Sequence, residues 1–285
     1  KKKKIKNVVT YLNDKFQKMY KADENLSLDE SLIKFRGRLS YVQFIPKKRA
    51  RFGIKFYKLC ESKSGYCLAI QIYTGQDKKN EETPASESVV LGLTEKILGK
   101  GYTLYLDSWY SSPKLYLKLW KKKTNVVGTV RPDRKNFPKE LKKINLKKSE
   151  VVTRARRPLL ALRWKDKRDV YMLSTKHVNA NIKNTGKTRR VKKRRPEIED
   201  VKKPECIIDY KKYMGGVDRH DQILANFPIM RKFVKGYRKI FFYMMDMALF
   251  NTCTLFLKIT NQKKVKFSEF LIEPCRNVTE TCRII

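Results

Sequence analysis

Four aspartates, Asp29, Asp107, Asp218 and Asp221, are the residues of this chain whose type and spacing could carry chemistry. Asp29 and Asp107 each follow a short apolar run, and Asp218 and Asp221 lie one turn apart at the start of an apolar helical segment. Taken singly, such acids are most simply turn formers or residues favoured at a helix N-terminus. Taken together in a basic protein, three sites of carboxylates predict a cage for two Mg²⁺ or Mn²⁺ ions, which prefer oxygen ligands and can cleave phosphodiesters.

The elements around these acids suggest how they are positioned. Asp29 is expected to end a short alternating strand over residues 26–29. Asp107 follows a buried strand at 102–106, which places it at the carboxyl end of the sheet, where open α/β sheets carry their active sites. Gly215 and Gly216 precede Asp218 and allow a close backbone approach.

The remaining pattern over residues 1–130 predicts an α/β sheet with mixed strand directions. Residues 8–20 form a basic amphipathic helix by their apolar spacing. A hairpin, two helices and a further strand follow; the expected ranges are 53–60 and 66–73 for the hairpin, 89–98 with Ser88 as its cap and 114–121 for the helices, and 126–130 for the strand. Ser112 and Pro113 suit the N-cap and first turn of the second helix.

Residues 131–204 do not continue this alternation of strands and helices, and their composition predicts a basic, β-rich insertion. Two β-like runs, 159–164 and 169–174, lie inside it, and 179–195 is expected to be a solvated basic loop. Helical periodicity returns after Cys206 and persists to about Lys258.

The charge of the chain indicates the class of its partner. Sixty-seven lysines and arginines against 28 acids give a net charge of +39, which points to nucleic acid because neutralised phosphates release counterions. An apolar fraction of 41% excludes a disordered basic tail. A basic RNA- or ribosome-associated structural protein would explain the charge but not the aspartates.

Other residue types exclude further classes. The six cysteines form no C-x-x-C pair and only two histidines accompany them, so we expect reduced thiols rather than a zinc site or disulfides. Residues 240–257 are apolar enough to span a membrane but contain Asp246 and Asn251, which favours a buried helix. The chain starts at Lys1, so we expect it to be part of a longer protein.

Several other side chains have less specific interpretations. Trp109 and Tyr110 are expected to pack in the core rather than stack on bases. His220 is expected to be a surface helix histidine. The expected core residues of the last helix are Phe241, Phe242, Met244, Met245 and Phe250, with Asp246 in need of a buried partner. The basic run at 187–195 is either a nuclear localisation signal, a phosphate-binding loop or a solvated charge run.

Three segments in series resemble the catalytic blocks of piggyBac-type transposases. The first is DESLIKFRGR at 29–38, followed by FIPKK at 44–48 and FGIK at 52–55. The second is DSWYSS at 107–112 and the third is GGVDRHDQ at 215–222. Order and spacing agree with the family over about residues 26–257, and each block carries its acid.

The resemblance implies a ribonuclease H-like mixed-sheet α/β core interrupted by a β-rich insertion, with flanking helical elements. The implied domains are a remnant of a helical dimerisation and DNA-binding region at 1–25, the core at 26–130, the insertion at 131–205, the end of the core at 206–227, and a second helical region at 228–285.

The resemblance also implies a function. Asp29, Asp107 and Asp218 would hold two Mg²⁺ or Mn²⁺ ions, with Asp221 supporting. The activity would be hydrolysis and strand transfer at transposon ends and TTAA targets of double-stranded DNA, in the nucleus, by a homodimer, with no membrane and no small-molecule substrate. The residues expected to contact DNA are Arg36, Arg38, Lys47, Lys48, Arg189, Arg190, Lys192, Lys193 and Tyr237.

This chain departs from the family in three respects. The family's long N-terminal portion is largely absent, and Cys275 and Cys282 do not rebuild the cysteine-rich domain that ends many members. Where some members carry a Trp that stacks on a base, Tyr237 is the nearest aromatic. The alternative is therefore a domesticated, catalytically silent protein that still binds DNA.

Overall fold

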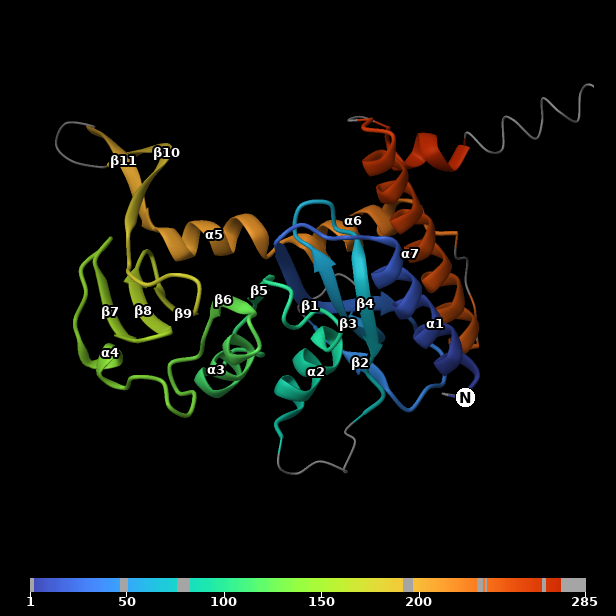
Figure 1. The fold of residues 1–285 in the computed structure, drawn as a ribbon, viewed down its shortest axis with the longest axis horizontal. Helices are drawn as coiled ribbons and strands as arrows, with labels where there is room; N and C mark the ends of the chain where they lie inside the picture. The colour runs from blue at the N-terminus through green and yellow to red at the C-terminus, as the bar shows by residue number, and fades with distance from the viewer. Residues whose placement is uncertain are drawn as a thin grey trace, which may run out of the picture. The chain divides into compact units, whose positions relative to one another are not determined.

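The computed structural model has a mixed α/β fold and describes residues 3–46, 51–75, 83–191, 197–229, 233, 235–262 and 265–272 (Figure 1). Its contacts divide the chain into two compact units. Unit 1 comprises Lys1–Ala22, Glu30–Lys79 and Gly216–Ile285, and unit 2 comprises Asp23–Asp29 and Asn80–Gly215. Strand β1, Asn25–Lys34, contributes its first half to unit 2 and its second half to unit 1.

The sheet of unit 2 is mixed, as the sequence predicts. Its strands run in the order β1, β5, β6, β9, β8, β7. The first three are parallel and the others add to β6 in antiparallel fashion; their bounds are Thr103–Leu106 for β5, Asn125–Thr129 for β6, Val151–Arg156 for β7, Leu159–Lys165 for β8 and Asp169–Ser174 for β9. The runs expected in the insertion thus extend the same sheet as β5 and β6. The domain limits themselves stay a prediction.

Strand β1 differs from its predicted form. Leu26, Ser27 and Leu28 are all fully buried rather than alternating, because a strand flanked by neighbours in a covered sheet buries both faces. The strand also continues past Asp29 to Lys34, so the expectation that it ends at Asp29 was wrong.

The helices of unit 2 are α2 (Ala85–Thr94), α3 (Pro113–Lys121), α4 (Glu140–Lys143) and α5 (Glu205–Tyr213). The prediction for α3 is confirmed, since the Ser112 side chain caps it by accepting the Leu115 N–H at 3.2 Å. The expected start of α2 was wrong: Pro84 stands at its N-cap and Ser88 lies inside the helix.

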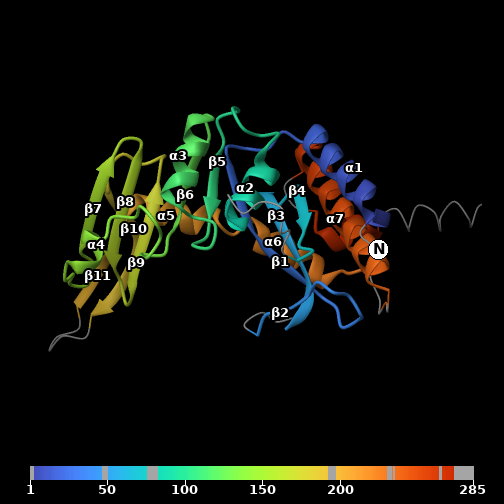
Figure 2. The same ribbon diagram turned by 90° about the horizontal axis from the view of Figure 1, so that it is seen from below.

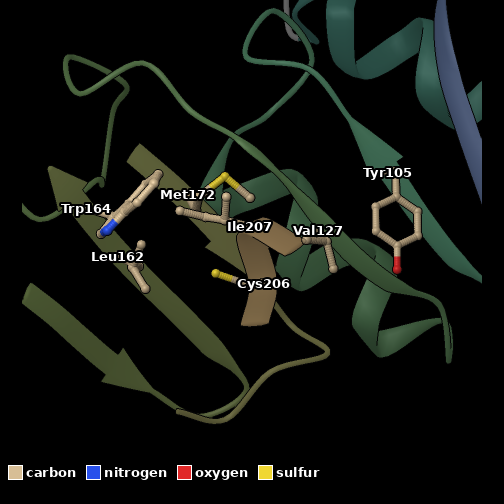
Figure 3. Close-up of a cluster of buried hydrophobic side chains, with 7 residues drawn as sticks. All are labelled: Tyr105, Val127, Leu162, Trp164, Met172, Cys206 and Ile207. Atoms are coloured by element: carbon tan, nitrogen blue, oxygen red, sulfur yellow. The ribbon is translucent and has the colours of Figure 1, made fainter. Parts of the chain in front are cut away.

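One hydrophobic cluster holds the sheet of unit 2 together (Figure 3). Val127, Leu162, Trp164 and Met172 from the strands meet the first turn of α5, which supplies Cys206 and Ile207; Tyr105 completes the set. The helical periodicity predicted after Cys206 therefore corresponds to α5, which packs on the sheet. The four described cysteines, 60, 67, 206 and 253, are buried free thiols.

The expected basic loop at 179–195 is instead a β-ribbon. Strand β10 (Ile182–Val191) pairs antiparallel with β11 (Glu197–Pro204), with a register shift between Asn184 and Thr188. Backbone pairing needs no apolar side chains, and polar contacts such as Asn184 Nδ2 to Asp200 Oδ2 at 2.8 Å join the strands. Sequence periodicity therefore could not indicate this ribbon.

Unit 1 contains a second arrangement of strands around β3 (Phe52–Glu61). Strand β2 (Val42–Phe44) pairs with the start of β3 and β4 (Cys67–Ile72) with its later part, both antiparallel, while β1 is its further neighbour. The predicted hairpin is confirmed, with Gly65 in its turn at φ +81°.

Helices α1 (Lys3–Met19), α6 (Gly216–Asn226) and α7 (Gly236–Ile259) complete unit 1, and α1 packs against α7 (Figure 2). Helix α7 is long and apolar enough to cross a membrane by composition. Asp246 and Asn251 are nevertheless buried and bonded: Asp246 Oδ1 accepts the Ile229 N–H and Asn251 bonds both backbone groups of Cys67. Met244 and Phe250 are buried, as predicted, but Phe241 is 40% exposed, so its assignment to the core was wrong.

Candidate active site

Asp29 and Asp107 are brought together by strand register. β1 and β5 run parallel, and Leu28 and Leu106 are register partners. The residue that follows each of these leucines is an aspartate, and neighbouring strands lie about 4.8 Å apart, so the chain passes from one strand level into both aspartates side by side. Both side chains are half-buried. Two carboxylates therefore share one edge of unit 2, and β5 ends immediately before Asp107 as predicted.

A tight turn fixes Asp107. Its Oδ1 accepts the Trp109 N–H at 2.6 Å, and its carbonyl accepts from both the N–H and the Oγ of Ser111, at 3.2 and 2.9 Å. Asx-type bonding of this kind orients the carboxylate and satisfies the turn. Tyr110 is only 1% exposed, which confirms its packing role, and Trp109 contacts it edge to face.

A second layer of contacts supports the turn. The hydroxyl of Tyr116, fully buried on α3, lies 2.9 Å from Ser111 Oγ. A Cβ on Gly128 would collide with the Leu106 carbonyl and the Tyr116 hydroxyl, so only glycine fits there. Arg134 Nη2 donates to the carbonyls of Ser108 and Trp109 at 3.1 and 2.6 Å. No pattern in the sequence points to Tyr116, Gly128 or Arg134.

Asp218 lies in unit 1, in the first turn of α6, and is exposed. Among the described residues it has no hydrogen-bond or ion-pair partner. The neighbouring residues anchor the helix to the β3–β4 hairpin: Arg219 Nη1 donates to the carbonyls of Ser62 and Lys63, and His220 Nδ1 lies 3.0 Å from the Gly65 carbonyl.

His220 is buried, and the expectation of a surface histidine was wrong. Its ring packs edge to face on Phe250 at 4.9 Å. Burial, with the Lys58 ammonium nearby, lowers the pKa of His220 to about 3, so the ring is neutral at physiological pH. It lies on the inner face of the helix whose outer face carries Asp218.

Asp221 joins a buried polar network that the sequence did not reveal. The ammonium of Lys58, fully buried on β3, donates to Asp221 Oδ1 at 2.6 Å and to the Tyr243 hydroxyl at 2.5 Å. Ser31 Oγ donates to the same oxygen at 2.9 Å. A lysine within an apolar strand gives no sign of its partner in the sequence.

The residues expected to contact DNA are only partly described. Arg36 and Arg38 are exposed after β1, and the Arg36 guanidinium lies 6.0 Å from the Phe52 ring. Tyr237 is half-buried at the start of α7. Arg189 and Arg190 belong to β10 by their backbone, while Lys47, Lys48, Lys192 and Lys193 lie outside the described residues.

The donor chemistry of the paired acids suits a hard divalent cation. Asp29 and Asp107 offer oxygen ligands at one sheet edge, which Mg²⁺ and Mn²⁺ prefer. Within the described parts of the chain, no group of three or more His, Cys, Asp or Glu side chains stands in a metal-holding arrangement. The pair is therefore a fitting but partial ligand set.

A family model and two relatives indicate the family of this chain. A family model described as Transposase IS4 matches residues 1–253. PiggyBac transposable element-derived protein 3 of Homo sapiens is 29% identical over 94% of this chain and 46% of its own length. PiggyBac transposable element-derived protein 2 of Homo sapiens is 26% identical over 88% of this chain and 44% of its own length.

Among solved structures, the fold is similar to the cryo-EM structure of a piggyBac transposase synaptic complex with hairpin DNA. The TM-score is 0.83 at 24% identity, over 94% of this chain and 55% of that one. This likeness confirms the expected fold class. The chain spans about half the length of the relatives it matches.

Proposed function

We propose, from the premise that this chain belongs to the piggyBac-type Transposase IS4 family, that it is a metal-dependent DNA transposase. The proposed reaction is hydrolysis and strand transfer at transposon ends, with TTAA sequences as targets. The observation that carries this proposal is the placement of Asp29 and Asp107 directly after register partners on adjacent parallel strands.

Asp29, Asp107 and, on the resemblance, Asp218 would hold two Mg²⁺ or Mn²⁺ ions. When bound, such ions activate a nucleophile and stabilise the leaving oxygen of a phosphodiester. The chain's own groups hold the ligands ready: the Trp109 N–H orients Asp107, and the Ser111 and Arg134 contacts fix the turn beneath it. Such outer contacts commonly determine how well a site holds its metal.

Double-stranded DNA is the proposed partner. A net charge of +39 favours a polyanion, and Arg36 and Arg38 stand exposed beyond the strand that carries Asp29. Arg189, Arg190 and Tyr237, together with Lys47, Lys48, Lys192 and Lys193 outside the described residues, are proposed further contacts. A homodimer acting in the nucleus completes the proposal.

Cleavage of TTAA-flanked transposon ends tests the activity. The 285-residue chain should nick labelled duplexes with Mg²⁺ or Mn²⁺, and Asp107→Ala should abolish nicking while DNA binding persists. Ser108→Ala, one residue along the same turn, is the matched control and should cut like wild type. Equal nicking by wild type and Asp107→Ala would refute a role for this carboxylate.

The second candidate is a transposase-derived DNA-binding protein without cleavage. Two observations favour it: the human relatives are named as derived from transposable elements, and the described residues show no complete three-ligand cluster. Wild type and Asp107→Ala would then bind duplex DNA equally and both stay inert with every metal. Preference for structured RNA over all DNA would exclude both candidates.

A further inference from the structure

We infer that Lys58 is a positioning residue, which holds Asp221 and, through it, the turn of helix α6 that carries Asp218. The inference rests on the proposed function, in which Asp218 is a ligand of a divalent cation. It assigns a role to Lys58, which no pattern in the sequence singles out.

The Asp221 carboxylate is already engaged inside unit 1. Its Oδ1 accepts from Lys58 Nζ at 2.6 Å, Ser31 Oγ at 2.9 Å and the Tyr243 hydroxyl at 3.3 Å. These donors come from β3, β1 and α7, so three elements converge on one oxygen of α6. A divalent cation on the same carboxylate would be repelled by the ammonium that touches it.

The ion pair is stable because separating the two side chains would leave a buried charge without a counter-charge. Burial opposes both charges. The pKa of Lys58 nevertheless lies above its ordinary value because it faces the Asp221 carboxylate, and the pKa of Asp221 lies below its ordinary value because it faces the ammonium. The Lys58 side chain is 0% exposed, so without Asp221 its charge would be buried and uncompensated.

Fixing Asp221 holds in place the helix turn that carries Asp218. Asp218 and Asp221 lie three residues apart on α6, within one helical turn, so a shift of the helix at Asp221 also moves Asp218. Asp221 is held by the donors on β1, β3 and α7, and Arg219 and His220 form hydrogen bonds with the β3–β4 turn. Asp218 is exposed, and the described residues give its side chain no hydrogen-bond or ion-pair partner.

The test combines amide hydrogen exchange in α6 with Mn²⁺ titration by calorimetry, on the full 285-residue chain. The variants are Lys58→Met, Asp221→Asn, Asp218→Asn and the double variant Lys58→Met/Asp221→Leu. Lys55→Met is the matched control because it removes a lysine from the same strand, where Lys55 lies over the Tyr57 ring and is only half-buried.

We expect faster exchange of α6 amides in Lys58→Met and Asp221→Asn, with Mn²⁺ affinity about 10- to 100-fold weaker, as for lost outer contacts of metal ligands. Asp218→Asn should leave exchange unchanged and remove Mn²⁺ binding, and Lys55→Met should change neither. The double variant should recover the thermal midpoint, since apolar pairs can replace buried ion pairs, but not the Mn²⁺ affinity.

Two results would overturn the inference. One is loss of Mn²⁺ binding in Asp221→Asn with α6 exchange unchanged, which would make Asp221 a ligand. The other is full recovery of Mn²⁺ affinity in the double variant, which would reduce the pair to a stabilising contact. If wild type binds no Mn²⁺, the proposed function fails, and exchange in Lys58→Met against Lys55→Met still decides whether the pair positions α6.

Discussion

Asp29 and Asp107 each follow one member of the register pair Leu28 and Leu106, on adjacent parallel strands. Parallel neighbours bring residues about 80 positions apart to one edge at the same level, without any local signal linking them. This placement is the reason why we propose Asp29 and Asp107 as ligands of a divalent cation, which prefers carboxylate oxygens.

Removing either charge should weaken metal binding without unfolding the chain. In Asp107→Asn the amide oxygen still accepts the Trp109 N–H, so we expect the free energy of unfolding to change by about 1 kcal/mol or less. Mn²⁺ affinity should fall about tenfold or more in Asp29→Asn and in Asp107→Asn. Calorimetry measures this, with the exposed Asp133→Asn as control. Unchanged affinity in both variants would exclude the pair as ligands.

DNA binding should depend on Arg36 and Arg38 through charge. Each phosphate contact contributes about 0.9 to the slope of log affinity against log salt, so Arg36→Ala/Arg38→Ala should lower that slope by about 2 for any duplex sequence. Fluorescence anisotropy across a salt series measures the slope. Lys100→Ala/Lys122→Ala removes the same charge from exposed positions of unit 2 and should matter less. Equal losses in both double variants would mean that net charge alone drives binding.

Ser111→Ala should destabilise the turn that holds Asp107. The change removes a donor to the Asp107 carbonyl and leaves the buried Tyr116 hydroxyl without this partner, at a cost of about 1–3 kcal/mol. The midpoint of urea unfolding measures the effect. Ser108→Ala, in the same turn, should shift the midpoint little, and similar shifts in the two variants would contradict the network described here.

Buried His220 should make stability fall in acid. Its folded-state pKa is depressed to about 3, so below its ordinary value of about 6.5 the unfolded chain takes up a proton that the folded chain does not. The free energy of unfolding should therefore decrease as pH falls from about 6.5 towards 3, by up to about 1.4 kcal/mol per pH unit from this group.

His220→Gln should lessen this dependence while an amide N–H can still reach the Gly65 carbonyl. Urea unfolding at pH steps from 7 to 4.5 gives the two slopes, and His177 contributes equally to both proteins. Parallel pH profiles would show that His220 is protonated in the folded state or exchanges freely with solvent.

The sequence predicted an element correctly wherever the residues that determine the element lie within one short segment. Ser112 and Pro113 start α3 because a cap and a fixed φ act within one turn, and the β3–β4 hairpin closes through its own glycine turn. The start of helix α2 was misplaced because this helix begins without a side-chain cap: the Pro84 carbonyl accepts the N–H groups of Glu87 and Ser88, so Ser88 already lies inside the helix. The β10–β11 ribbon was missed because backbone pairing between polar strands leaves no apolar pattern.

The sequence by itself determined the acids, the basic surroundings, the order of the blocks and the fold class, since residue types, spacing and periodicity are properties of the chain alone. Only the tertiary structure decided that Asp29 and Asp107 are neighbours, that His220 is buried, and that Asp221 is committed to Lys58. The reason is physical, because strand register and burial arise from packing between segments that are distant in the sequence. A buried charge likewise needs a partner, and that partner can lie far away along the chain, where no sequence pattern links the two residues.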